Sequence, residues 1–85
     1  MDPTAQTLQK ETEKWLAKLE RERANLKILK DSKELKVVMR NVDAYIKDTR
    51  HFLGKGDFVR AFEATIYAWG LLEGAEHLKL VEKGK

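Results

Sequence analysis

Cysteine is absent from this sequence, and proline occurs once. Without cysteine the fold can use neither disulfide bonds nor thiolate metal sites, and a thiol nucleophile is excluded. Long apolar runs are also missing: none approaches the roughly 20 residues that a membrane-spanning helix needs, and no basic segment followed by an apolar one opens the chain. These absences predict a cytoplasmic protein that does not contact membranes.

The chain has 85 residues, of which 36% are charged and 8% are aromatic. This length suits one domain, close to the lower limit of roughly 70 to 80 residues at which a core stands without disulfides or metal. Many Lys, Arg and Glu with few Met is the usage of heat-adapted proteins, so we expect a thermostable domain. The net charge of +3 is concentrated in the middle, because residues 27–60 carry nine positive and five negative side chains.

The segment from Gly56 to Leu80 is apolar on more than one face. At a period of 3.6 residues it has two apolar stripes. The stripe of mostly large side chains consists of Phe58, Phe62, Thr65, Ile66, Trp69 and Leu72. The stripe of mostly small side chains consists of Ala61, Ala64, Ala68, Leu71, Ala75 and Leu78. A helix with two apolar faces needs two neighbours. We therefore predict that residues 57–79 form the central helix of a small bundle.

A first helix is predicted over residues 3–29. Asp2-Pro3 is a favourable start, because Asp is a good N-cap and Pro is tolerated at the first helical position. The apolar residues that follow form a heptad-like seam in which Glu22 is the charged member. Glu22 either lies near a bundle end and reaches solvent, or is a buried carboxylate with a functional role.

A second helix is predicted over residues 32–53, where the apolar residues form a single regular stripe. Asp31 or Ser32 can cap its start. Gly54 is the expected left-handed residue at its end, and Asp57 is the expected cap of the third helix. The short connection between these helices makes them antiparallel.

These elements predict an all-α fold, an antiparallel up-down-up three-helix bundle with helices over 3–29, 32–53 and 57–79. Residues 81–85 are expected to be a fraying tail. The predicted core consists of Trp15, Leu19, Val38, Val42, Ile46, Phe52, Phe58, Phe62, Ile66, Trp69 and Leu72.

No complete catalytic or metal-binding set stands out. Glu73 and His77 are four residues apart on one helical face, which provides two ligands of a metal site, and Asp48 with His51 is a similarly incomplete pair. The single serine, Ser32, is a helix cap, so no triad can be drawn, and no glycine-rich phosphate loop follows a strand. We therefore expect no enzyme activity, no metal and no cofactor.

The third helix also has a face outside its two apolar stripes, formed by Glu63, Tyr67, Gly70, Gly74 and His77. Each mid-helix glycine costs about 1 kcal/mol relative to alanine, and together they make a shallow groove that a second helix can approach. One interpretation is that the glycines accommodate the first helix of the same chain. The other is an interface for a protein partner or a homodimer, and a polar cluster of an enzyme is a third, less supported reading.

The second helix has a basic ridge that suits phosphates, formed by Lys33, Lys36, Arg40, Lys47 and Arg50. Asp43 and Asp48 are expected to interrupt it, and no aromatic side chain is evidently presented to stack on bases. A solvated helix face explains the same pattern. Nucleic-acid binding through this ridge is the alternative function.

The stretch GDFVRAFEATIYAWGLLEGAEHL, which starts at Gly56, resembles the archaeal helical proteins grouped as domain of unknown function 357. The resemblance covers Tyr45 to about Leu80, with Glu73 where the family pattern has aspartate. It implies a compact three-helix bundle in an archaeal cytoplasm, and it brings no assigned activity and no catalytic residues. Together with the glycine-bearing face, it favours a non-enzymatic module for protein interaction or self-association.

Overall fold

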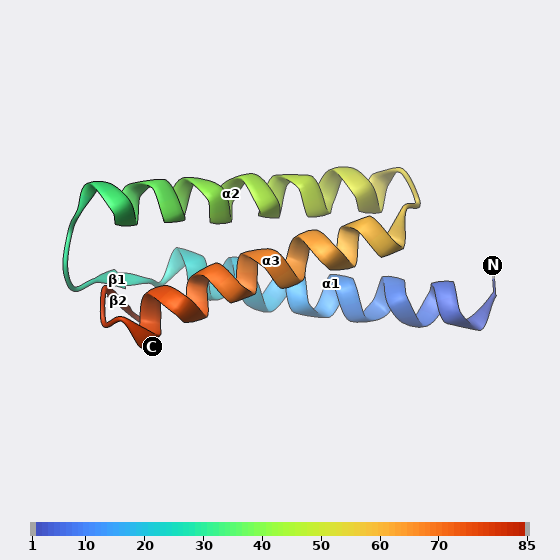
Figure 1. Ribbon diagram of the computed structural model, residues 1–85. Helices are drawn as coiled ribbons and strands as arrows, with labels where there is room; N and C mark the ends of the chain where they lie inside the picture. Colours follow the sequence, from blue (N-terminus) through green and yellow to red (C-terminus); the bar gives the residue numbers. More distant parts are fainter. Residues whose placement is uncertain (1, 85) are drawn as a thin grey trace.

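The computed structural model describes residues 2–84. It contains three helices, α1 (Pro3–Ala24), α2 (Lys33–Gly54) and α3 (Phe58–His77), and two short strands, β1 (Lys27–Ile28) and β2 (Val81–Glu82). α1 and α3 run in one direction and α2 runs in the other (Figure 1). The predicted all-α, up-down-up three-helix bundle is confirmed.

Side-chain caps set where each helix begins. Asp2, Ser32 and Asp57 each accept a hydrogen bond from the backbone amide three residues later, at 2.9, 3.0 and 3.2 Å. Each bond satisfies an amide that has no partner within its own helix. Between α2 and α3 the left-handed residue is Gly56, with a φ of 74°, and not Gly54, which still belongs to α2.

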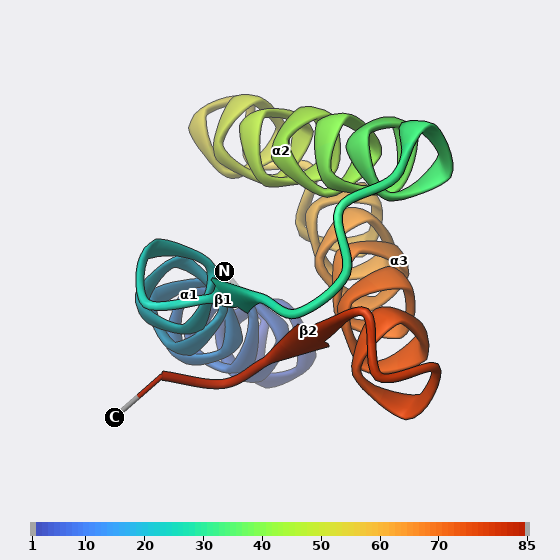
Figure 2. The same cartoon turned by 90° about the vertical axis from the view of Figure 1, so that its left-hand side faces the viewer.

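α3 is the central helix, because it lies against both others whereas α1 and α2 contact each other little (Figure 2). On the α2 side, the hydroxyl of Thr65 lies 3.1 Å from that of Thr49. On the α1 side, Nε1 of Trp69 donates to the carbonyl oxygen of Trp15 at 3.3 Å, and the two rings meet edge to face. Small buried side chains on α3 permit this close packing, and they are Ala61, Ala64, Ala68 and Ala75.

The core differs from the prediction in one important place. Leu19, Val42, Ile46, Trp69 and Leu72 are buried as expected. The other predicted members are partly buried, and they are Trp15, Val38, Phe52, Phe58 and Phe62. Ile66 is wrongly predicted, because 46% of its surface is exposed. At this level of α3 the alanines and Thr65 face the neighbouring helices. Ile66 lies on a different side of the helix and is therefore turned toward solvent.

The predicted end of the first helix at residue 29 is wrong, because α1 ends at Ala24. The side-chain amide of Asn25 donates to the carbonyl oxygen of Arg21 at 2.9 Å and closes the last turn. The chain then turns into β1, which pairs antiparallel with β2. The fraying tail is also wrong for the described residues, because Val81 is only 2% exposed and belongs to the core.

Glu22 lies beside this strand pair and not in open solvent. Its Oε1 is 3.1 Å from Nζ of Lys83, which also reaches Glu76 at 3.6 Å. The other oxygen, Oε2, is buried without a hydrogen-bond partner among the described residues. The hydrogen bond to Glu22 and the negative charge of both carboxylates raise the pKa of Lys83. Through Lys83, Glu22 therefore links the C-terminal segment to α1, and Glu76 links it to α3.

Candidate interaction face

The glycine-bearing face of α3 is exposed along its whole length. Glu63, Tyr67, Gly70, Gly74 and His77 are all solvent-exposed. At Gly70 and Gly74, no heavy atom of residues 2–84 outside the local helix backbone lies within 4 Å of the position that a Cβ would occupy. The interpretation that these glycines accommodate the first helix is therefore wrong, since α1 packs on another side of α3, at Trp69.

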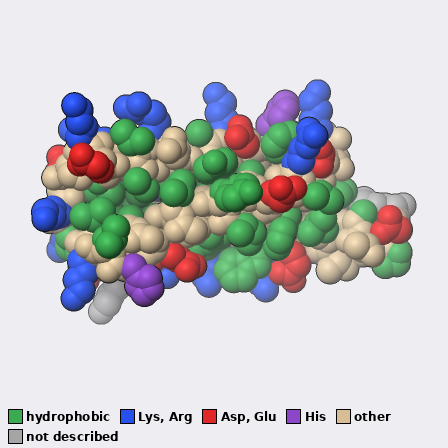
Figure 3. Space-filling view, in the orientation of Figure 1, with side chains coloured by type: hydrophobic (Ala, Val, Ile, Leu, Met, Phe, Trp, Pro, Cys, Tyr) green, Lys and Arg blue, Asp and Glu red, His purple; other side chains and the backbone are tan. Residues whose placement is uncertain are grey.

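Exposed apolar side chains flank the glycines. Tyr67 is 58% exposed and Ile66 is 46% exposed. At about 100° per residue, the two side chains lie one turn before Gly70 and to either side of it around the helix. In the space-filling view, hydrophobic side chains run across the middle of this side of the molecule, and acidic side chains lie among them (Figure 3). We call Glu63, Ile66, Tyr67, Gly70, Glu73, Gly74 and His77 the α3 face.

The edge of α2 adds an aromatic pair to the α3 face. The rings of Tyr45 and Tyr67 have their centroids 5.6 Å apart and are tilted by 33°. Beside them a groove of about 460 Å³ runs between the two helices, lined by Asn41, Tyr45, Ile66, Tyr67, Gly70 and Leu71. Tyr67 therefore forms one side of a groove that extends to Gly70.

Sequence reasoning missed the contribution of α2, although a signal was present. Tyr45 and Tyr67 are each eleven residues from Gly56, the left-handed residue of the turn. In an antiparallel hairpin, residues equidistant from the turn lie at the same level. The pairing of the two tyrosines could thus have been read from the position of the turn.

The polar members of the α3 face do not converge on a pocket. Glu63 and His77 are separated by 14 residues of helix, a distance of about 21 Å at 1.5 Å per residue. Neither Glu73 with His77 nor Asp48 with His51 gains a further ligand: within residues 2–84 no group of three or more His, Asp or Glu side chains could hold a metal ion. The arrangement provides separate polar contacts along a line.

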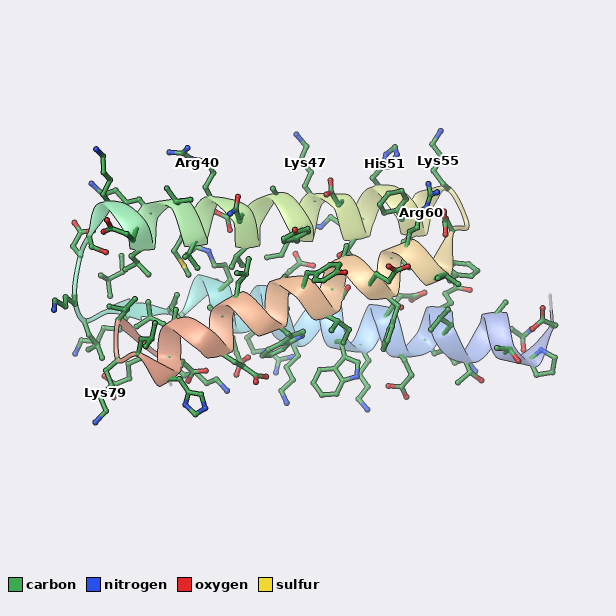
Figure 4. The ribbon with its side chains drawn as sticks, viewed as in Figure 1. Arg40, Lys47, His51, Lys55, Arg60 and Lys79 are labelled. Carbon is green, nitrogen blue, oxygen red and sulfur yellow. The ribbon has the colours of Figure 1, made fainter. Side chains whose placement is uncertain are left out.

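The basic ridge of α2 faces away from the bundle. Arg40 and Lys47 project from the outer side of this helix, and His51 and Lys55 continue the row toward its C-terminal end (Figure 4). Lys33 and Lys36 are exposed as well. In the part of the chain that the structure describes, none of the four cations Lys33, Lys36, Arg40 and Lys47 forms an ion pair. Arg50 differs, because it pairs with Glu20 of α1.

The expectation that two aspartates interrupt the ridge is wrong. Asp43 turns toward α1, where its two carboxylate oxygens accept hydrogen bonds from Arg23 at 2.8 and 3.1 Å. Asp48 lies at the opposite edge, in a groove shared with Tyr67 and Arg60 of α3. The two carboxylates flank the row of cations, and Asp43 borders a groove that Lys36 and Arg40 also line.

None of the helices in the described range 2–84 is long and apolar enough to cross a membrane.

Comparison with known proteins gives a family and a fold. A family model described as "Protein of unknown function (DUF357)" matches residues 9–81. Among solved structures, the chain is similar to the crystal structure of protein AF1782 from Archaeoglobus fulgidus, which is assigned to the same family model. The two are 38% identical, with a TM-score of 0.82, over 94% of this chain and 97% of that one. No curated protein matches the chain. The match begins well before Tyr45, so it includes α1, which the sequence resemblance did not.

Proposed function

The chain belongs to the DUF357 family, whose description assigns no function, and from its surface we propose that it is a non-enzymatic protein-interaction module. The α3 face receives an amphipathic helix of another polypeptide chain. The observation that carries this proposal is the pair of exposed glycines in the middle of α3, flanked by exposed Ile66 and Tyr67.

The energetic argument starts from the cost of the glycines. Each disfavours the helix by about 1 kcal/mol relative to alanine, and no neighbouring element of the described chain uses the space that they leave. A helix that approached Gly70 and Gly74 would use it, because missing side chains let two backbones come close. Tyr67 supports the same conclusion, since tyrosine is enriched in interfaces, where it buries a large area at low entropic cost.

On the α3 face the described polar side chains do not converge, which supports a binding role over a catalytic one for this face. A catalyst must hold its acid, base or nucleophile within reach of one reacting atom. On the α3 face, Glu63 and His77 lie at opposite ends of a line, and the groove at Tyr67 is lined mainly by apolar atoms. Such a surface is suited to bury apolar area and to orient a partner with a few polar contacts.

A photo-crosslinking amino acid at Tyr67 tests this proposal in cells that produce the protein. We expect it to crosslink to a polypeptide, and we expect the crosslink to disappear when Gly70→Glu fills the groove with a charged side chain. The matched control places the same amino acid at Ala17, an exposed position of α1. Equal crosslinking from both positions, or a crosslink that survives Gly70→Glu, would remove the α3 face as the binding surface.

A second candidate is binding of nucleic acid by the α2 ridge, and the observation that favours it is the unpaired state of its cations. Lys33, Lys36, Arg40 and Lys47 have no acidic partner in the described structure, whereas Asp43, the carboxylate nearest in sequence to Arg40, is engaged by Arg23. Cations left without internal partners can neutralise phosphates, and such binding weakens steeply as salt rises. The ridge lies on the outer side of α2 and the α3 face lies on α3, so the two candidate functions can be tested separately.

A further inference from the structure

We propose that the helix received by the α3 face is α3 of a second copy of this chain, packed antiparallel about a twofold axis at Gly70. The inference rests on the proposed function of the α3 face and adds the identity and the direction of the partner. Its basis is that the residues on either side of Gly70 are complementary to one another.

Symmetry fixes which residues meet. When two copies of one helix pack antiparallel about a twofold axis at residue 70, each residue lies opposite the one equally far from Gly70 in the other direction. At about 100° per residue, the pairs that lie near the centre of the contact and face each other are Glu63 with His77 and Ile66 with Gly74, each formed twice. Tyr67 and Glu73 lie on its two opposite flanks. All six positions are exposed in the structure, so none has to leave the core to take part.

Each pair is complementary in charge, shape or hydrogen bonding. At the two ends of the contact, the carboxylate of Glu63 faces the imidazole of the partner subunit's His77, which can donate a hydrogen bond and attracts the carboxylate when protonated. Nearer the axis, the branched side chain of Ile66 meets the open backbone at Gly74 of the partner subunit. The ring of Tyr67 lies on the same flank as the partner subunit's Gly74 and can cover the open backbone there.

The edge of α2 supports the same register. Asn41 lines the groove beside Tyr67, so its side-chain amide borders the flank of the contact that Tyr67 covers. Tyr45 stacks against Tyr67 from behind and limits the freedom of that ring. A ring held in place loses less entropy when the interface forms.

The parallel arrangement is disfavoured by the same residues. In a parallel twofold pair the residues near the centre of the face meet their own copies, so Glu63 would face Glu63. Like charges placed opposite each other across an interface cost free energy. Ile66 would also meet Ile66 at the point where the glycines should let the backbones approach.

Charge exchange between the ends of the contact tests the direction of packing. By sedimentation equilibrium, we expect the wild-type protein to form a concentration-dependent dimer with a dissociation constant of about micromolar order, as small interfaces do. Glu63→Lys alone removes the carboxylate that the partner's His77 contacts, and His77→Glu alone places two carboxylates opposite one another, so each should weaken the dimer at least about tenfold. The double variant Glu63→Lys with His77→Glu restores opposite charges and should recover most of the affinity.

The control pair Glu13→Lys and His51→Glu changes the same residue types at exposed positions of α1 and α2 and should leave the dimer unchanged. Circular dichroism checks that every variant remains helical. A wild-type dimer that the double variant fails to restore overturns the antiparallel register. A monomer at all concentrations overturns the second copy as partner, and if Tyr67 still crosslinks to a different polypeptide, the proposed function survives that result.

Discussion

Two glycines of this chain have opposite environments, and alanine substitution separates them. The Cβ position at Gly70 is open, whereas a Cβ at Gly84 would collide with the backbone carbonyl oxygen of Asn25. The added methyl group at residue 70 meets no neighbouring atom, so only the higher helix propensity of alanine acts. Gly70→Ala should therefore stabilise the monomer by about 1 kcal/mol. Gly84→Ala should destabilise it, since the backbone at Asn25 has to move.

Urea unfolding in dilute solution measures both changes. A loss of stability in Gly70→Ala would show that the position is already packed against something in the folded chain, which would also weaken the case for the α3 face.

The ammonium group of Lys83 gives the C-terminal segment a defined dependence on pH. Its pKa is raised in the folded state by the hydrogen bond to Glu22 and by the charges of Glu22 and Glu76. A raised pKa means that the folded chain holds this proton more tightly than the unfolded chain does. The stabilisation is therefore complete below the ordinary lysine value of 10.5 and is lost as the pH rises above it.

The variant Lys83→Met isolates this effect from the titration of the other lysines and the tyrosines. We expect the free energy of unfolding to differ between wild type and variant at about pH 8, and the difference to shrink as the pH rises above the ordinary lysine value of 10.5. The side chain is 44% exposed, so the effect should be small and should fall with added salt. An unchanged difference across this range would mean that the ion pair does not contribute.

At the scale of elements, β2 is a structural part of the bundle. Val81 is buried together with Leu19 and Leu72 in one cluster, and Leu80 accepts hydrogen bonds from the amides of Leu29 and Lys30 at 2.9 and 3.1 Å. Val81→Ala removes two methyl groups from this core and should cost roughly 2 kcal/mol. Val59→Ala, at a 60% exposed position of α3, is the control and should cost much less.

Thermal unfolding followed by circular dichroism distinguishes the two variants. Equal effects of Val81→Ala and Val59→Ala would indicate that the C-terminal strand is only loosely held.

Local patterns predicted the helices well, and failed where distant residues decide. The caps at Asp2, Ser32 and Asp57 act within three residues, so they could be read from the sequence. The end of α1 could not, because the seam continues through Leu26 and Leu29, and the chain leaves the helix only to pair with residues that follow about 50 positions later. Ile66 was misplaced for a related reason: periodicity shows which positions share a face, and the neighbours decide which face is buried.

At the scale of the whole molecule, the row of cations and the exposed apolar side chains of α3 lie on different sides of an elongated body of 45 × 23 × 17 Å. The α3 face carries the exposed glycines and aromatic side chains, and the outer side of α2 carries the row of cations (Figure 4). The positions of the two surface features followed from sequence periodicity. The ion pair that engages Asp43 did not, because Arg23 belongs to a different helix.

The ridge makes a prediction that a matched pair of charge variants can decide. If four cations neutralise phosphates of a single-stranded oligonucleotide, the logarithm of the binding constant should fall with the logarithm of salt concentration with a slope of about −3. The triple variant Lys36→Glu, Arg40→Glu and Lys47→Glu should abolish binding, as measured by fluorescence anisotropy. The control Lys10→Glu, Lys14→Glu and Lys79→Glu changes the net charge equally at exposed positions elsewhere, and Lys79 projects from the opposite side of the molecule (Figure 4). Equal loss in both variants would show that net charge alone drives binding, because an attraction that depends on total charge does not distinguish one face from another. A ridge that positions phosphates requires its own cations, so only the triple variant on α2 should then lose binding.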